Sequence, residues 1–143
     1  MKTRSWLGFV ILALAIVGLI LQQSILGTGP LSIGLQAVAC ALMIWARATF
    51  GRRSFHASAD PTEGGLVTTG PYRHIRHPIY AAVLLFALVA VATHPTAANV
   101  ALGIVMIAGV ALRVTAEERL VVERYPEYAE YASRTKRFIP GVL

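Results

Sequence analysis

The chain of 143 residues is 56% hydrophobic and only 14% charged, and its formal net charge is +6. Soluble domains are usually about a quarter charged, so this composition excludes a typical soluble domain and indicates a single membrane domain. The positive charge alone would suit a nucleic-acid binder, but its placement along the chain argues against that class.

Two long stretches carry no formal charge, one between Arg4 and Arg47 and the other between Arg76 and Arg113. Each is longer than the roughly 20 residues that one spanning helix needs, and turn residues interrupt each near its middle, at 27–30 and 93–96. The sequence therefore predicts an all-α integral membrane protein with four membrane helices in two hairpins, over about 6–26, 31–50, 77–92 and 97–115. The rest of the single domain, 1–143, is expected to form a cytoplasmic connector at 51–76 and a C-terminal amphipathic helix and tail at 116–143.

The basic residues all fall on one side of this four-helix arrangement. Such asymmetry is the positive-inside pattern, which predicts that both termini face the cytoplasm and that the bilayer, not nucleic acid, is the partner. The apolar run after the first basic residues is longer than a signal-peptide core, so we expect it to stay as the first helix. The 13 Lys and Arg residues are Lys2, Arg4, Arg47, Arg52, Arg53, Arg73, Arg76, Arg113, Arg119, Arg124, Arg134, Lys136 and Arg137.

The third expected helix is short for a membrane span. Residues 79–92 extend only about 21 Å at about 1.5 Å per residue, against a hydrocarbon core of roughly 30 Å. Either this helix begins earlier, or helices one and two shelter the second hairpin. A sheltered hairpin would leave its cytoplasmic end free to form a pocket.

Polar side chains crowd the stretch 70–80, directly before this helix, with two His, two Arg, two Tyr and two Pro. Each must find a partner at the membrane boundary, because an unpaired polar group is costly there. Antiparallel pairing places His77 level with Arg113, and Glu117 lies one turn further on the same helix face. His74, His77 and Glu117 leave a metal site as a minor alternative, but without a Cys pair or a His-x-x-x-His pattern we predict no metal.

Four motifs carry a resemblance to a known family. They are Leu66-Val67-Thr68-Thr69-Gly70-Pro71-Tyr72-Arg73, Arg76-His77-Pro78-x-Tyr80, Arg113-x-x-x-Glu117-Glu118 and Arg137-Phe138-Ile139-Pro140-Gly141. Together they resemble the isoprenylcysteine carboxyl methyltransferase family, to which phospholipid N-methyltransferases are related. The resemblance covers residues 64–141. One departure is Gly64-Gly65, which stands where eukaryotic members carry a His-Thr pair.

The resemblance implies a membrane enzyme that uses S-adenosyl-L-methionine, bound in a pocket that faces the cytoplasm. Arg113 matches the position implicated in binding the substrate. The compact chain is similar to prokaryotic members, which implies the inner or cell membrane of a prokaryote. The residues expected to contact the cofactor are Leu66, Val67, Tyr72, His77, Pro78, Ile79, Tyr80 and Glu117.

The chemistry of the candidate catalytic residues Arg113, Glu118 and His77 depends on the methyl acceptor. A carboxylate is already ionised at neutral pH and needs only a cation such as Arg113 to hold it. An amine or a phenol needs a base, for which His77 or Glu118 are the candidates. Glu117 can accept hydrogen bonds from the cofactor's ribose or amino group, and tyrosine rings can face adenine or the sulfonium.

The expected function is methylation of an amphiphilic acceptor that enters from the bilayer, most simply the carboxyl group of an isoprenylcysteine-like or other isoprenoid or lipid substrate. A phospholipid N-methyltransferase, a membrane sterol-type reductase that uses NADPH, and a non-enzymatic membrane scaffold stay open as alternatives. Structural interpretations are open too: Arg113 and Glu117 can form a plain salt bridge, and Arg73 and Arg76 can set topology or contact lipid headgroups. The oligomeric state is left open.

Overall fold

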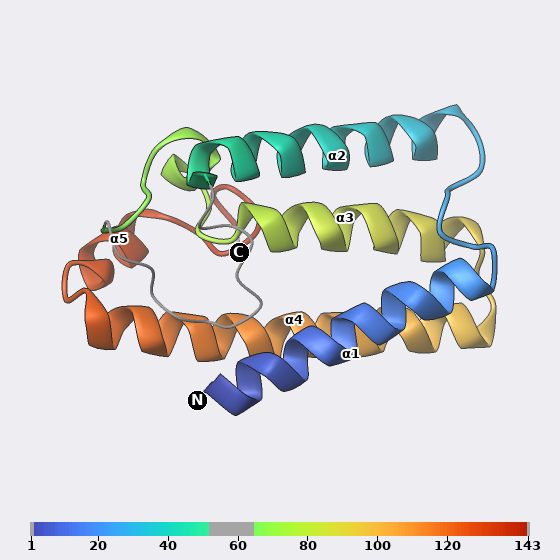
Figure 1. The fold of residues 1–143 in the computed structure, drawn as a ribbon. Coiled ribbons are helices and arrows are strands. Elements are labelled where there is room, and N and C mark those ends of the chain that lie inside the picture. The colour runs from blue at the N-terminus through green and yellow to red at the C-terminus, as the bar shows by residue number, and fades with distance from the viewer. Residues whose placement is uncertain (1, 52–64, 143) are drawn as a thin grey trace.

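The computed structural model describes residues 2–51 and 65–142, so residues 52–64, half of the expected connector, lie outside the described residues. The described part is helical and contains no strand, apart from an isolated bridge between Ile75 and Lys136. Its elements, shown in Figure 1, are α1 (Lys2–Leu21), α2 (Pro30–Phe50), the short 3₁₀ helix η2 (Gly70–Arg73), α3 (Pro78–Thr93), α4 (Ala97–Arg124) and α5 (Tyr128–Arg134).

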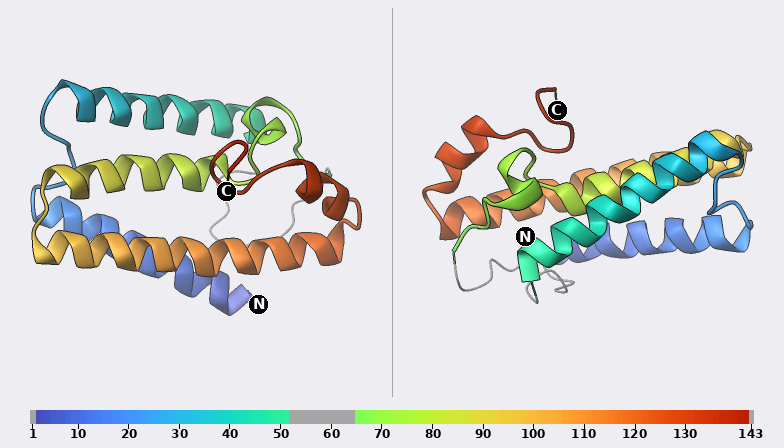
Figure 2. Two further views of the ribbon diagram at one scale, coloured as in Figure 1. Left: turned by 180° about the vertical axis from the view of Figure 1, so that it is seen from behind. Right: turned by 90° about the horizontal axis from the view of Figure 1, so that it is seen from above.

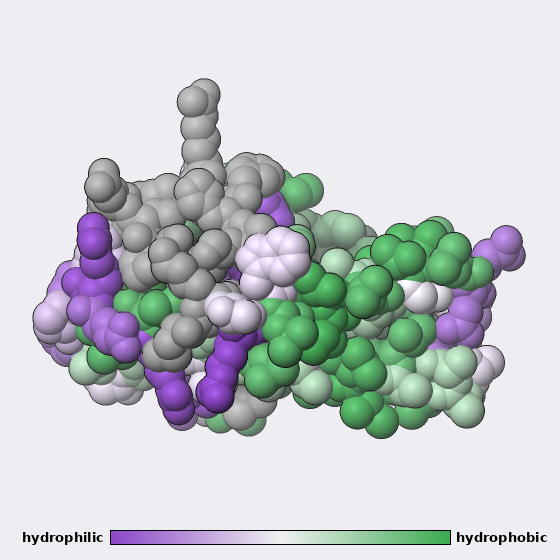
Figure 3. All heavy atoms as spheres, turned by 60° about the horizontal axis from the view of Figure 1, so that its bottom comes forward, coloured by the Kyte–Doolittle hydropathy of each residue, from purple (hydrophilic) through white to green (hydrophobic). Residues whose placement is uncertain are grey.

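Three of these helices are long and apolar enough to cross a membrane: Thr3–Leu21, Pro30–Phe50 and Ala97–Arg124. On the face that Figure 3 shows, an apolar surface extends from the middle of the molecule toward one end, and hydrophilic side chains gather at both ends. Such an apolar band is what lipid tails require, so the protein is a membrane protein. The fourth apolar helix, α3, has 16 residues, which corresponds to about 24 Å at about 1.5 Å per residue.

The short helix α3 lies between α2 on one side and α4 on the other (Figures 1 and 2). It does not begin earlier than the sequence suggests, because His77 is its N-cap and Pro78 occupies its first turn. Of the two explanations for a short third helix, the structure therefore favours shelter by neighbouring helices over an earlier start. The second hairpin is flanked by helices one and two as we expected, with α2 against α3 and α1 against α4.

Helix α1 packs mainly against α4 and barely touches α2, so the first expected hairpin is open. Two glycines explain the close approach of α1 and α4. A Cβ atom at Gly8 would lie 2.7 Å from the carbonyl oxygen of Gly109, and one at Gly109 would lie 3.0 Å from the side chain of Ile11. Small residues at a crossing let helix backbones approach closely in a membrane. This contact seats the start of α1 beside the middle of α4.

The buried core is shared by α1, α3 and α4. Tyr80 and Phe138 pack against its edge as partly buried residues, so the core reaches the polar end of the bundle. The core residues are Leu12, Ala15, Leu19, Ala87, Met106, Val110 and Val114.

Two expected helix boundaries are wrong. Helix α1 ends at Leu21 and not near residue 26, because Gln23 adopts a positive φ of 53° that stops the helix. Helix α4 continues to Arg124, so residues 116–124 extend the fourth helix and do not begin a separate amphipathic one. Tyr125, extended at φ −129° and ψ 91°, precedes Pro126, which disfavours a helical residue before it. The separate C-terminal helix is therefore only α5.

The end of the bundle opposite η2 and α5 is closed by neutral hydrogen bonds. The amide of Gln36 on α2 accepts from the Gly27 N–H at 2.9 Å and donates to the carbonyls of Ile25 at 3.0 Å and Phe86 at 3.1 Å. This side chain is only 4% exposed. Gln36 thus fastens the loop after α1 and the middle of α3 to α2.

Candidate functional site

Three segments meet at the polar end of the bundle: the start of α3, the last third of α4 and the C-terminal tail. The tail runs beside the residues that lead into α3, held by backbone hydrogen bonds. Arg76 N–H donates to the Lys136 carbonyl at 2.7 Å, and His77 N–H donates to the Arg137 carbonyl at 3.0 Å. The tail motif and the Arg-His-Pro motif, 60 residues apart, are therefore neighbours in space.

An inner cluster joins α3 to α4 around one oxygen of Glu117. The Tyr80 hydroxyl donates to Glu117 Oε1 at 2.5 Å, and Arg113 Nε lies 3.0 Å from the same oxygen. Arg113 Nε also donates to the Tyr80 hydroxyl. The sequence prediction that the pairing of helices three and four brings residues 77–80 to Arg113 and Glu117 is confirmed.

Helix α1 completes this inner cluster on the other side of Arg113. The guanidinium carbon lies 5.4 Å from the centre of the Phe9 ring and 5.8 Å from that of Tyr80, and one nitrogen lies 3.4 Å from the Ser5 carbonyl. Arg113 is only 5% exposed. A charge so deeply buried must be paired, and the Glu117 carboxylate supplies the compensating charge.

The second oxygen of Glu117, Oε2, has fewer hydrogen-bonding partners than Oε1. This oxygen lies 4.0 Å from His77 Nδ1, which is beyond hydrogen-bond distance, and within residues 2–51 and 65–142 it accepts no hydrogen bond. The side chain is 20% exposed. Glu117 therefore presents one fixed oxygen and one that can accept a hydrogen bond from a ligand.

An outer cluster surrounds the neighbouring Glu118. Its carboxylate lies 3.0 Å from Arg76 Nε, 3.2 Å from His77 Nε2 and 2.7 Å from a terminal nitrogen of Arg137. The Tyr128 hydroxyl adds a long contact of 3.4 Å. Cationic neighbours stabilise the ionised carboxylate, so this setting makes Glu118 a weak proton acceptor and a good anchor for His77 and the tail.

Arg76 has an internal role, not contact with lipid headgroups. Besides Glu118, its guanidinium donates to the carbonyls of Ala132, at 2.9 Å, and of Thr135. These carbonyls lie at the C-terminal end of α5, where backbone acceptors lack helical partners. Arg76 thus connects α5, α4 and the residues before α3, whereas Arg73 is exposed.

The expected cofactor residue Tyr72 makes its contacts with α2 and α5. Its ring packs on Phe50 with centroids 5.4 Å apart, and its carbonyl accepts a 2.6 Å hydrogen bond from the Tyr131 hydroxyl. Burial raises the pKa of Tyr72, and burial also raises the pKa of Tyr131 to about 12, so both phenols stay neutral. Gly70, at φ +56°, lets η2 approach α2, because a Cβ there would lie 2.5 Å from the Thr49 hydroxyl.

The remaining candidates lie in the coil before η2 and in the first turn of α3. Pro78 is buried in the first turn of α3 and Ile79 is half-buried beside it, while Leu66 and Val67 are half-buried in the coil before η2. The structure therefore brings His77, Tyr80, Arg113, Glu117 and Glu118 together, with Arg137 added from the tail.

Sequence reasoning assigned no site role to Phe9 and Ser5 of α1, which both contact Arg113. No motif marks them within an apolar helix. It also assigned none to the Phe138 ring, 6.1 Å from that of His77. The quoted tail motif was the one signal that pointed toward Phe138.

Comparison with known proteins identifies the class. A family model described as phospholipid methyltransferase matches residues 24–128. The chain belongs to this family, and the resemblance to isoprenylcysteine carboxyl methyltransferases and their relatives is confirmed. The protein is accordingly a membrane protein of a methyltransferase family.

One curated relative is the cobalt-zinc-cadmium resistance protein CzcN of Cupriavidus metallidurans, which is 37% identical over 76 residues. The match covers 52% of this chain and 35% of the relative, so the chain spans about a third of the length of that protein. No solved structure matches the chain.

Proposed function

We propose that the protein transfers a methyl group from S-adenosyl-L-methionine to an amphiphilic acceptor that reaches the site from the bilayer. The observation that carries this proposal is the inner cluster, in which Tyr80 and Arg113 fix Glu117 while leaving its Oε2 without a hydrogen bond among the described residues. The cluster lies at the polar end of an apolar bundle, where an amphiphile would present its headgroup.

The residues present fit this cofactor. Glu117 Oε2 can accept a hydrogen bond from a ribose hydroxyl or the amino group, and the half-buried Tyr80 offers an aromatic face to a cation. His77 and Pro78 would form the wall at the start of α3, with Ile79 beside them. On this proposal Leu66, Val67 and Tyr72 complete the pocket. The bound cofactor supplies a methyl group already activated by its sulfonium, so the protein's task is to align the acceptor and exclude water.

The acceptor that suits the cluster best is a carboxylate, as in an isoprenylcysteine-like or other isoprenoid substrate. A carboxylate is ionised at neutral pH and needs no base, and Arg113 is the cation paired with Glu117 beside it. Glu118 would orient His77 through the 3.2 Å contact to Nε2. The tail would then seal one side of the pocket through Phe138 and Arg137.

We also propose that all four apolar helices span the membrane, with both termini in the cytoplasm of a prokaryotic cell. The loops at residues 22–29 and 94–96 carry no Lys or Arg, whereas the other end of the bundle carries all the described basic residues. This distribution follows the positive-inside rule. Because α3 is flanked by α2 and α4, its short length is compatible with a span.

Two measurements test the function. Isothermal titration of the purified protein with S-adenosylhomocysteine and separately with NADPH should show binding of the first only. Incubation with labelled S-adenosylmethionine and a lipid extract, followed by mass spectrometry, should then give a labelled carboxyl ester. A labelled phospholipid amine would replace the proposed acceptor, and binding of NADPH alone would contradict the methyltransferase proposal altogether.

A further inference from the structure

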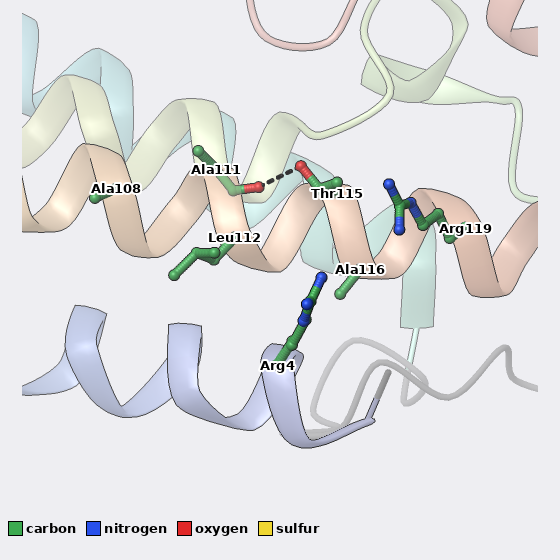
Figure 4. A pocket seen from close by; sticks show the side chains of 7 residues that line it. All are labelled: Arg4, Ala108, Ala111, Leu112, Thr115, Ala116 and Arg119. Carbon is green, nitrogen blue, oxygen red and sulfur yellow. Dashed lines mark hydrogen bonds between the residues drawn. The ribbon is translucent and has the colours of Figure 1, made fainter.

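A groove of about 450 Å³ lies on the outer face of α4, beside the start of α1 (Figure 4). Its α4 wall is made of small or apolar side chains. The one hydroxyl in this wall, that of Thr115, donates to the Ala111 carbonyl of its own helix at 2.7 Å, so it offers little polarity to a ligand. This wall consists of Ala108, Ala111, Leu112, Thr115 and Ala116.

Two arginines complete the groove at its polar end. Arg4 points from α1 toward the α4 face between Leu112 and Ala116, and Arg119 lies one turn beyond Thr115 (Figure 4). Both are exposed, and neither makes a salt bridge or hydrogen bond with another residue that the structure describes. Two cations without an anionic partner among the described residues thus line one groove, and an anion between them would be attracted to both.

The groove belongs to a different face of α4 from the candidate active site. Glu117 and Arg113 point toward α3 and α1, whereas Ala108, Ala111 and Leu112 are exposed on the surface of the helix. The two sites adjoin along the chain on both helices. Ser5, whose carbonyl contacts Arg113, follows Arg4 on α1, and Leu112 and Ala116 of the groove wall directly precede Arg113 and Glu117 on α4. The groove nevertheless opens on a face of α4 that the candidate active site does not use.

We propose that this groove binds one anionic phospholipid, with the phosphate between Arg4 and Arg119 and an acyl chain along Ala108 and Leu112. The order of the groove supports this occupant: its basic end lies at the charged end of the bundle, and its apolar end runs toward the middle of α4. A soluble anion would match only the basic end, and a zwitterionic lipid would gain less from the two arginines. The bound lipid pins the start of α1 against α4.

The test measures thermal unfolding and native mass spectra of the detergent-purified chain with added dioleoyl phosphatidylglycerol, dioleoyl phosphatidylcholine or inorganic phosphate. We expect phosphatidylglycerol alone to raise the melting temperature and to remain bound. Each arginine near an anionic headgroup is worth about fivefold in affinity, so Arg4→Gln with Arg119→Gln should weaken phosphatidylglycerol binding roughly 25-fold. Ala108→Phe, which fills the apolar end without removing a charge, should also weaken it.

Arg124→Gln is the matched control, because Arg124 is exposed in the last turn of the same helix and does not line the groove. It should bind phosphatidylglycerol as the wild type does. The proposal is overturned if Arg124→Gln loses as much affinity as Arg4→Gln with Arg119→Gln, or if phosphate alone gives the same rise in melting temperature. Unchanged binding in both the double variant and Ala108→Phe would overturn it as well.

Discussion

The two ends of the helical bundle both contain buried polar side chains, but they use them differently. At one end Gln36, a neutral amide, makes three hydrogen bonds that tie loop and helices together. At the other end Arg113 is buried as an ion beside Glu117, whose second oxygen accepts no hydrogen bond from a described residue. The first network is closed, and the second is charged and open to a ligand.

The difference separates stability from function in physical terms. Neutral hydrogen bonds inside an apolar bundle satisfy polar groups whose burial without a partner would cost free energy, and they do not require contact with water. Buried ions are expensive to desolvate, and hydrophobic replacements are often just as stable. A charged cluster at a membrane boundary is therefore a candidate for function by default, whereas the Gln36 network is fully explained by structure.

The largest expected effect is on stability, from removal of the buried cation. Arg113→Leu leaves the Glu117 charge without its partner, which should lower the free energy of unfolding by about 3–5 kcal/mol. Urea or thermal unfolding in detergent measures this loss. Adding Glu117→Leu to the same chain should restore most of it, since an ion pair replaced on both sides leaves no uncompensated charge. An Arg113→Leu protein as stable as the wild type would show that the charges are not coupled.

The next effect is on ligand affinity. Glu117→Gln keeps the shape of the side chain but removes a charged acceptor, and a hydrogen bond to a charged group is worth about 1.5–3 kcal/mol. We expect S-adenosylhomocysteine to bind roughly tenfold to a hundredfold more weakly, as measured by titration calorimetry. Glu123→Gln, on the exposed surface of the same helix, is the control and should bind normally. Equal affinities for the two variants would remove Glu117 from the cofactor site.

A change in the neutral Gln36 network should lower stability without changing the affinity for the ligand. Gln36→Leu removes three hydrogen bonds and leaves the Gly27 N–H without its acceptor, so it should destabilise the protein by about 1–2 kcal/mol. Its affinity for S-adenosylhomocysteine should not change. Gln22→Leu, at an exposed position near the end of α1, is the control for the loss of an amide and should leave stability unaltered. A large loss of affinity in Gln36→Leu would break the distinction between the two ends.

Local sequence signals were sufficient for most helices and for the centre of the candidate site. Uncharged runs and turn residues located four apolar helices, and antiparallel pairing of α3 with α4 placed Tyr80 near Glu117. These features depend on spacing within the chain, which hydrophobic periodicity and helix geometry describe well. The same reasoning placed the end of α1 five residues too late, because a polar Gln-Gln pair within a long apolar segment is a weak stop signal.

Local sequence signals could not predict the contacts between segments that are distant in the chain. Nothing in the sequence signals that Gly8 meets Gly109, or that Phe9 covers Arg113. The tail likewise reaches Glu118 only because its backbone runs beside residues 74–77. These contacts depend on tertiary packing. Many faces of the helices are equally apolar, so the sequence does not indicate which face packs against which neighbour.

The smallest expected effect concerns this tail. Arg137 is half-exposed, and such ion pairs contribute up to about 1 kcal/mol, so Arg137→Gln should barely change global stability. It should instead loosen the tail locally. Because Arg76 and His77 donate their N–H groups to tail carbonyls, their hydrogen exchange should accelerate by up to about fivefold. Arg134→Gln, which breaks a highly exposed pair with Glu130, should leave both amides unchanged. If neither variant alters this exchange, backbone pairing alone holds the tail, and Glu118 serves His77 and Arg76 without anchoring the chain end.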